Sequence, residues 1–240
     1  MYLIGCCSLG LVVRDEHTTN AEPADPTRRQ VGFEQLEERM MGPMPELVGA
    51  VVAAGRLCRQ PQPTLTVDEL TVRPWRPSDA TAVVTAYRAP QIQRWHVRTM
   101  DDAEARAWVA SWADRWAAET AASWAVTDAG GVLLGRTGFR SVDLAGGSAE
   151  AAYWTMPAAR GRDIAARALI AVSGWMLADG GLHRLELSHS VENPASCRVA
   201  TKAGYGYEGT RRQQALHSDG WHDMHLHALI AEPDQSGAIR

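Results

Sequence analysis

The chain has 240 residues, of which 45% are hydrophobic, and a formal net charge of -4 at pH 7. That length allows one domain with a large core plus an extension, and the weak negative charge gives no electrostatic reason to expect nucleic acid or an anionic membrane as partner. No stretch approaches the roughly 20 apolar residues of a membrane span. The four cysteines, Cys6, Cys7, Cys58 and Cys197, lack the spacing of a metal site. We therefore expect a cytoplasmic chain without a disulfide framework.

Residues 1–63 are predicted to form an N-terminal extension that carries no catalytic chemistry. Residues 14–30 are polar and contain two prolines, which is typical of a linker. Residues 45–59 can form one helix, because five apolar residues fall partly on one face, and the prolines at 61 and 63 would end it. The extension is either a docking arm or a consequence of start-codon choice, since Met40, Met41 and Met44 are alternative starts.

Residues 64–232 alternate strand and helix patterns and predict one domain of the α/β class (mixed α+β), followed by a C-terminal tail at 233–240. A strand at 70–75 is followed by a helix from Ser78-Asp79 to about residue 88. A second helix opens at Asp101-Asp102 and carries three tryptophans spaced four apart, which predicts a core-facing stripe. The remaining predicted elements are a hairpin around Gly130-Gly131, strands at 150–156 and 182–190, helices at 163–178 and from 193, and two strands around Asp219-Gly220.

The most informative segment is 153–169 (YWTMPAARGRDIAARAL), which predicts a strand, a short loop and a helix. A helix N-terminus presents unpaired N–H groups and a positive dipole end, so a diphosphate could bind there. Arg160 and Arg162 add two positive charges beside those donors.

A second segment, 190–209 (SVENPASCRVATKAGYGYEG), predicts another helix. Asn193 suits the N-cap, Pro194 the first helical position and Gly204 the C′ position. Together, residues 153–169 and 190–209 resemble the two acyl-CoA-binding segments of the GNAT superfamily of N-acetyltransferases, in detail the branch of the ribosomal-protein N-terminal acetyltransferases. The resemblance implies a GNAT fold: a twisted, mostly antiparallel sheet, splayed at the acyl-CoA site, with helices on both faces.

The resemblance also implies acetyl-CoA as co-substrate. Its expected binding residues are Tyr153, Trp154, Thr155, Met156, Arg160, Gly161, Arg162, Asp163, Ile164, Ala165, Asn193 and Ser196. Asp163 stands where the family has Gly. It either points to solvent and favours the helix start, as the surrounding Arg160, Arg162 and Arg167 suggest, or it weakens CoA binding.

The implied reaction is direct attack of an amine on the thioester within a ternary complex. An α-ammonium has a pKa of about 8, so a base or a water relay is needed. Glu150 is the predicted base, with Asp223 a second candidate, and the alternative for Glu150 is a solvated strand-end carboxylate. Backbone N–H groups near Thr155 and Met156 would stabilise the oxyanion. The tyrosine that many members use to protonate the thiolate is absent, and Ser196 is its predicted replacement unless it only helps to cap its helix.

The acceptor cleft is expected from residues 85–105 and 211–227, with Trp95, His96, Trp221 and Asp223 on its walls. This mixed, aromatic character favours a small-molecule amine slightly over a strongly acidic peptide, and a protein N-terminus stays open. Among the C-terminal histidines, strand alternation separates His222 from His225 and His227, so no metal site is expected. The alternative function is a non-catalytic acyl-CoA-binding or interaction module. A monomer or homodimer is the family expectation.

Overall fold

The structure, a computed structural model, describes residues 48–232, which belong to one compact unit beginning at Val48. The predicted linker at 14–30 and the tail at 233–240 lie outside the described residues. No helix among residues 48–232 is long and apolar enough to cross a membrane.

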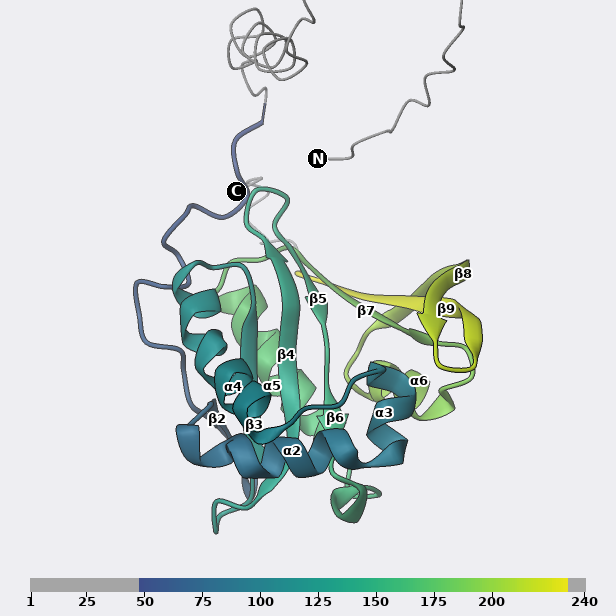
Figure 1. The fold of residues 1–240 in the computed structure, drawn as a ribbon. Helices are drawn as coiled ribbons and strands as arrows, with labels where there is room; N and C mark the ends of the chain where they lie inside the picture. Colours follow the sequence, from purple (N-terminus) through teal and green to yellow (C-terminus); the bar gives the residue numbers. More distant parts are fainter. Residues whose placement is uncertain (1–47, 233–240) are drawn as a thin grey trace, which may run out of the picture. The chain divides into compact units, whose positions relative to one another are not determined.

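A single nine-stranded sheet organises this unit, in the order β1-β2-β3-β4-β5-β7-β9-β8, with β6 paired to β4 (Figure 1). All pairings are antiparallel except that of β5 with β7. The strands are β1 (Leu65–Val67), β2 (Leu70–Pro74), β3 (Ala122–Thr127), β4 (Leu133–Asp143), β5 (Ser148–Ala151), β6 (Trp154–Thr155), β7 (Arg184–Ser190), β8 (Gly206–His217) and β9 (Gly220–Ile230).

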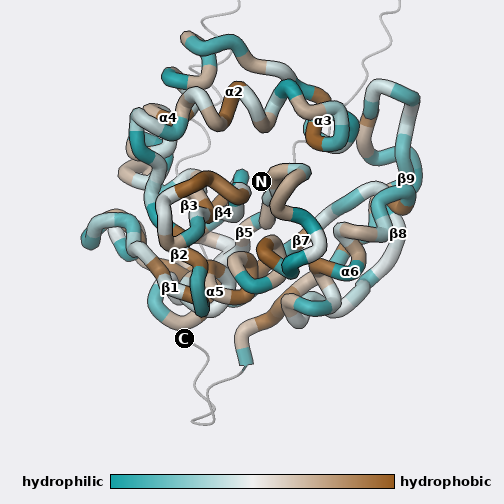
Figure 2. Tube along the Cα trace, turned by 90° about the horizontal axis from the view of Figure 1, so that it is seen from below, coloured by the Kyte–Doolittle hydropathy of each residue, from teal (hydrophilic) through white to brown (hydrophobic). Residues whose placement is uncertain are grey.

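Helices cover both faces of the sheet, as predicted (Figure 2). One face carries α2 (Ala80–Arg88), α3 (Pro90–His96) and α4 (Asp102–Ala117); the other carries α5 (Ile164–Ala178) and α6 (Pro194–Lys202). Short 3-10 turns lie at Pro77–Asp79 and Pro157–Ala159. Each layer buries its own cluster: Val72, Trp124 and Leu169 beside α5, and Val83 and Val109 beneath α2 and α4. The mixed α/β architecture is therefore confirmed.

The tryptophan-bearing helix α4 begins where the sequence predicts. The Asp101 carboxylate accepts from the Glu104 N–H, and the Glu104 carboxylate accepts from the Asp101 N–H, a capping box that satisfies two donors. Trp112 and Trp116 are buried, as expected of a core stripe. Trp108, one turn earlier, is half-buried and packs edge-on against Trp112.

The predicted strand 150–156 is broken in two, and this break opens the sheet. β5 pairs with β7 only where Ser148–Glu150 face Arg184–Glu186, and β6 pairs with β4 alone. The N–H groups of Ala152 and Met156 donate to β4 carbonyls, so by alternation those of Tyr153 and Thr155 point away from β4. The outer edge of β6 therefore faces a gap beyond which β7 continues, which confirms the splayed sheet.

The prediction of a helix over 45–59 is wrong for its described part, because residues 48–59 form turns and no helix. The N–H groups of Val51 and Val52 donate to the carbonyls of Ala145 and Leu144, and Gly55 adopts φ +83, which a right-handed helix excludes.

The same segment belongs to the domain rather than to a separate extension. The Glu119 carboxylate accepts from the N–H groups of Gly55, Leu57 and Cys58 at 2.5, 2.6 and 3.2 Å. Val52 and Leu57 are buried in the main core. The predicted boundary at residue 63 is therefore too late, since Val52 and Leu57, two of the apolar residues that suggested a helix, instead pack into the main core.

Candidate active site

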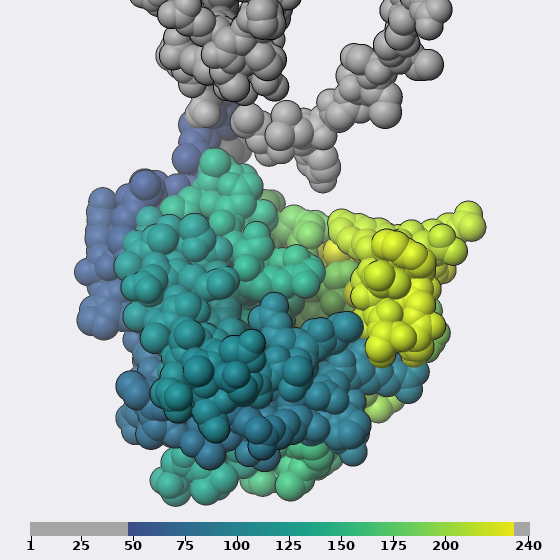
Figure 3. Space-filling view, in the orientation of Figure 1, coloured from purple at the N-terminus to yellow at the C-terminus, as the bar shows by residue number. Residues whose placement is uncertain are grey.

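Two adjoining pockets open at the gap between β6 and β7. The first has a volume of about 680 Å³ and the second about 390 Å³. Five residues line both: Trp95, His96, Tyr153, Asn193 and Ser196. The first pocket lies in the hollow between the β8–β9 hairpin and the blue and teal segments of Figure 3. The gap thus leads from one pocket into the other past Tyr153 and Ser196.

The second pocket collects most of the predicted cofactor residues. Ten of the twelve line it: Tyr153, Trp154, Thr155, Arg160, Gly161, Asp163, Ile164, Ala165, Asn193 and Ser196. Met156 and Arg162 do not, and the Met156 N–H is bonded to the Leu134 carbonyl, so it is not available to an oxyanion. Arg198 and Lys202, on α6, also line this pocket and were missed, although the resemblance of residues 190–209 to an acyl-CoA-binding segment was an available signal.

The loop before α5 has the shape of an anion site. Gly161 and Asp163 both adopt left-handed backbone conformations, with φ +78 and φ +52. Asp163 is the N-cap of α5, but its side chain makes no capping hydrogen bond. The first N–H groups of α5 are therefore left to a ligand, and the helix dipole favours an anionic one.

The surroundings of Asp163 differ from those expected. Its carboxylate is bound by Lys202, with Nζ at 2.6 and 2.7 Å from the two oxygens. Arg162 and Arg167 instead pair with Glu69, where the hydrogen bond from Arg167 holds the pKa of that carboxyl at about 2. Asp163 is thus neutralised by a lysine that also lines the cofactor pocket, and not by the neighbouring arginines.

Two hydroxyl groups meet at the junction of the pockets. The Asn193 side chain accepts from the Ser196 N–H at 3.2 Å and so caps α6, as predicted. The Tyr153 hydroxyl donates to the Ser196 carbonyl at 3.4 Å. Burial raises the pKa of Tyr153 to about 12, so it stays protonated at neutral pH. Tyr153 was expected only to contact the cofactor, and the structure places its hydroxyl as a second hydroxyl group beside Ser196.

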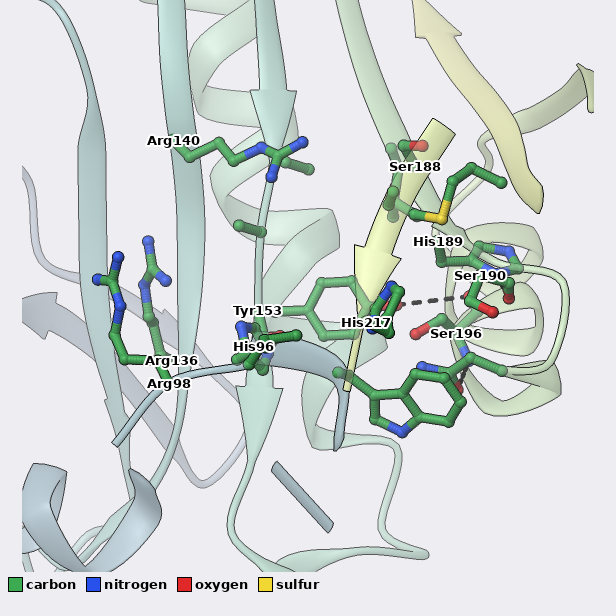
Figure 4. Close-up of a pocket in the computed structure, with 18 of the residues that line it drawn as sticks. His96, Arg98, Arg136, Arg140, Tyr153, Ser188, His189, Ser190, Ser196 and His217 are labelled. Carbon is green, nitrogen blue, oxygen red and sulfur yellow. Dashed lines mark hydrogen bonds between the residues drawn. The ribbon is translucent and has the colours of Figure 1, made fainter. Parts of the chain in front are cut away.

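Arginines dominate the first pocket. Arg98, Arg115, Arg136 and Arg140 all line it, and Figure 4 shows Arg98, Arg136 and Arg140 on the side away from Ser190 and Ser196. The Arg136 Nε donates to the Ser123 hydroxyl at 2.9 Å, and its guanidinium stacks on two indoles, at 4.8 Å from the Trp112 ring and 5.4 Å from that of Trp108.

These arginines are poorly matched by negative charge. Arg140 pairs with Glu150, but among residues 48–232 no carboxylate lies within salt-bridge distance of Arg98, Arg115 or Arg136. Burial lowers the pKa of Arg136, which expresses the cost of holding its charge away from water. The pocket is therefore positively charged, and the mixed charge expected from the sequence is not what the structure has.

Of the remaining predicted site residues, some line the pockets and others do not. Trp95 and His96 line both pockets, and burial together with the Arg136 charge lowers the pKa of His96 to about 4, so its ring is neutral. Glu150 lines neither pocket but contacts Arg140, which lines the first. Trp221 and Asp223 also line neither pocket: Trp221 is 61% exposed, and the Asp223 carboxylate accepts from the Gln213 N–H.

The irregular pairing of β8 with β9 explains why Trp221 and Asp223 line neither pocket. Its register against β9 shifts between Arg211 and Ala215, and residues 214–217 of β8 enter the pocket wall. The expected cleft segment 211–227 therefore does contribute to the pocket wall, but through β8, whereas the residues chosen from it, Trp221 and Asp223, lie on β9.

Comparison with known proteins agrees with this geometry. Residues 69–206 match the family model described as an acetyltransferase (GNAT) domain. Ribosomal-protein-serine acetyltransferase of Escherichia coli K12 is 30% identical over 100 residues, which make up 42% of this chain and 56% of that protein, so the match spans little more than half of that relative.

Solved structures show the same fold. RimL, a ribosomal-protein alpha-N-acetyltransferase in complex with coenzyme A, superposes with a TM-score of 0.66 at 21% identity, over 72% of this chain and 100% of that one. Mycobacterium smegmatis RimJ, in complex with a CoA disulfide, gives a TM-score of 0.64 at 24% identity, over 72% and 88%. Because the family model covers more than half of the sequence, the chain belongs to the GNAT acetyltransferase domain family.

Proposed function

We propose that this protein is an acetyl-CoA-dependent N-acetyltransferase that moves an acetyl group onto a primary amine by direct attack in a ternary complex. The observation that carries the proposal is the pair of pockets that meet at Tyr153 and Ser196 across the splayed strands. The RimL and RimJ structures, which share the fold, contain CoA or a CoA disulfide, and this supports a CoA ester as the co-substrate.

The second pocket suits the CoA moiety. The exposed edge of β6 can pair with the amide groups of the pantetheine arm, and the uncapped start of α5 can bind the diphosphate. Arg160 and Arg198 line the same pocket and supply positive charge to the phosphates, whereas the ammonium of Lys202 is held by Asp163.

The chemical step takes place at the junction. The amine nitrogen forms a bond to the thioester carbon, and the Thr155 N–H, which points into the gap, donates to the developing oxyanion. As the C–S bond breaks, the Ser196 or Tyr153 hydroxyl gives a proton to the leaving thiolate. Glu150 remains our proposed base, and because it lies behind Arg140, the proton reaches it through water. The pocket arginines also disfavour an ammonium ion, so they promote the neutral, nucleophilic amine.

We further propose that the acceptor carries an anionic group, a carboxylate or a phosphate, near its amine. A buried, unpaired guanidinium such as Arg136 is costly, and a bound oxyanion relieves that cost through charge-assisted bonds. The indole rings of Trp108 and Trp112, on which the Arg136 guanidinium stacks, fix the orientation of that guanidinium. This replaces the expectation of a cleft of mixed charge.

Two peptides with the same N-terminal residue, one with Asp and one with Asn at the second and third positions, test this acceptor class. Release of CoA thiol gives kcat/KM for each. We expect the Asp peptide to react at least about tenfold faster, because a hydrogen bond to a charged group contributes about 1.5–3 kcal/mol. Arg136→Gln should remove most of that preference, because Arg136 is the buried guanidinium with which the acidic side chain is proposed to pair. Arg162→Gln is the matched control, because Arg162 lines neither pocket and pairs with Glu69. Equal rates for the two peptides in the wild type would refute an anionic acceptor.

A further inference from the structure

A cluster of three histidines and one cysteine lies beside the active-site gap and takes no part in the proposed reaction. His189 is on β7, His225 and His227 are on β9, and Cys197 is on α6. One ligand atom from each lies within 4.8 Å of the others. Nitrogen and sulfur donors of this kind are those that Zn²⁺ and neighbouring transition metals prefer.

The sheet brings the three imidazoles to one face. His189 and His225 are directly paired across β7 and β9, and His227 follows two residues after His225, so the side chains of His225 and His227 point the same way. Their rings lie 5.2 to 6.3 Å apart, centre to centre. Cys197, one residue after Ser196, approaches from the helix above. Because the four donors come from three elements, residue spacing along one strand did not reveal them.

The distances suit tetrahedral coordination. The Nε2 atoms of His189 and His227 are 3.2 Å apart. Two nitrogens bound at about 2.0–2.1 Å to a tetrahedral zinc ion lie about 3.3 Å from each other. A nitrogen and a sulfur bound to the same tetrahedral zinc ion lie about 3.6 Å apart. Because all four donor atoms already lie within 4.8 Å of one another, the largest donor–donor distance needs to shorten by only about 1 Å.

The hydrogen bonds of His189 prepare it for this role. Its Nδ1 lies 2.8 Å from the Ser190 carbonyl and must donate there, which leaves a lone pair on Nε2 that points at His227. Metal-bound histidines are typically oriented in this way, by a carbonyl that accepts from the other ring nitrogen. Figure 4 shows His189 beside Ser190 at the edge of the first pocket.

Unmet hydrogen-bonding capacity gives independent support. Nδ1 of His225 and Nδ1 of His227 are buried, and neither makes a hydrogen bond of good geometry among the described residues. Without a metal, the short Nε2–Nε2 contact requires one of the two rings to carry its proton there. If that ring is His227, its Nδ1 lone pair stays buried and unsatisfied, which costs stability. An ion between the two Nε2 atoms accepts both lone pairs and lets His227 carry its proton on Nδ1.

We propose that His189, His225, His227 and Cys197 form a binding site for a divalent transition-metal ion of the zinc type. The four protein donors complete a tetrahedral set, so the ion ties α6 to the β7–β9 pair behind Ser196 and has a structural role. Cys197 loses its proton on binding, and its half-buried position, like that of His225, leaves a route for the ion. This proposal does not depend on the identity of the acyl acceptor.

The test is a titration of the full-length, chelator-treated protein with Co²⁺ and with Zn²⁺. Co²⁺ bound to a thiolate in a tetrahedral site gives a sulfur-to-metal charge-transfer band and intense visible bands. We expect these bands to saturate at one equivalent and to vanish on addition of one equivalent of Zn²⁺, which should also raise the melting temperature.

Three variants decide the outcome. Cys197→Ser should lose the charge-transfer band, and both Cys197→Ser and His225→Asn should bind Zn²⁺ more than about tenfold more weakly, the smallest effect reported for changes around metal ligands. His183 is an exposed histidine that directly precedes β7 and lies outside the cluster, so the His183→Ala variant should bind Zn²⁺ as the wild type does. A Cys197→Ser protein that keeps the charge-transfer band would overturn the proposal, because the thiolate would then come from elsewhere. So would a wild-type protein that binds neither ion.

Discussion

Asp163 limits the affinity for CoA in this account, so replacing it should tighten binding. Its carboxylate lies in the wall of the diphosphate pocket and holds the Lys202 ammonium at 2.6 and 2.7 Å. In Asp163→Asn, the negative charge is removed and Lys202 is released to the phosphates. Asn also tolerates the left-handed backbone at φ +52, so the local fold should be retained.

The magnitude follows from exposure. Both side chains are more than half exposed, at 59% and 52%, so each charge acts through a dielectric close to that of water. The variant loses the repulsion between Asp163 and the diphosphate and gains an attraction between Lys202 and the phosphates, each about 0.5–1 kcal/mol. Together they amount to about 1–2 kcal/mol, or roughly a 5- to 30-fold lower Kd for CoA. The N-terminal charge lost from α5 costs about 0.3–1 kcal/mol of stability, which Asp163→Gly should offset because glycine relieves the left-handed strain.

Calorimetric titration of CoA into the wild type, Asp163→Asn and Asp163→Gly measures this directly. Both variants should bind more tightly at low salt, and the gain should shrink at high salt, where exposed charges are screened. If both variants bind CoA no more tightly than the wild type at low salt, then Asp163 and Lys202 do not face the diphosphate, and the reasoning is refuted.

Ser196→Ala should lower kcat more than KM if the hydroxyl protonates the thiolate, and unchanged kcat in stopped-flow thiol release would assign that proton to Tyr153. Desolvation raises the pKa of Asp79, but the hydrogen bonds from Arg73 and from a backbone N–H outweigh it, so the folded-state pKa is lowered. The stability from this pair should therefore be complete above about pH 4 and fall as pH drops below it, whereas Asp79→Asn should be less stable at neutral pH and less sensitive to acid in melting curves. Leu57→Ala should lower the free energy of unfolding by about 2–5 kcal/mol in urea titrations, and an effect below about 0.5 kcal/mol would show that this segment is peripheral.

The parts of the fold with local signals were predictable. Asn193, Pro194 and Gly204 define the bounds of α6 by their own backbone preferences, and the loop before α5 depends on residues within a few positions of one another. The splayed sheet was expected only from the family resemblance, and the break within 150–156 was not expected, because nothing in those residues themselves interrupts a strand pattern.

The charge of the acceptor pocket was not predictable, because it depends on long-range packing. Arg136 lies within an apolar strand, and a charged residue in such a strand was the available signal that the adjoining space is functional. Arg98 follows α3, a helix that the sequence pattern did not suggest. Trp221 and Asp223 were misplaced because the register shift in β8 leaves no trace in the local pattern. The four proposed metal ligands meet only once β7, β9 and α6 are assembled.

Acetyl transfer to an amine is tested most directly by incubating the full-length protein with acetyl-CoA and the Asp-bearing peptide. The free thiol of CoA is then quantified, and the mass of the peptide is measured. We expect free CoA and peptide carrying one acetyl group on its N-terminal amine to appear in equal amounts, and only when both substrates are present. No acetylated peptide from either the Asp or the Asn peptide, while acetyl-CoA still raises the melting temperature, would contradict it for these acceptors and favour a non-catalytic acyl-CoA-binding module.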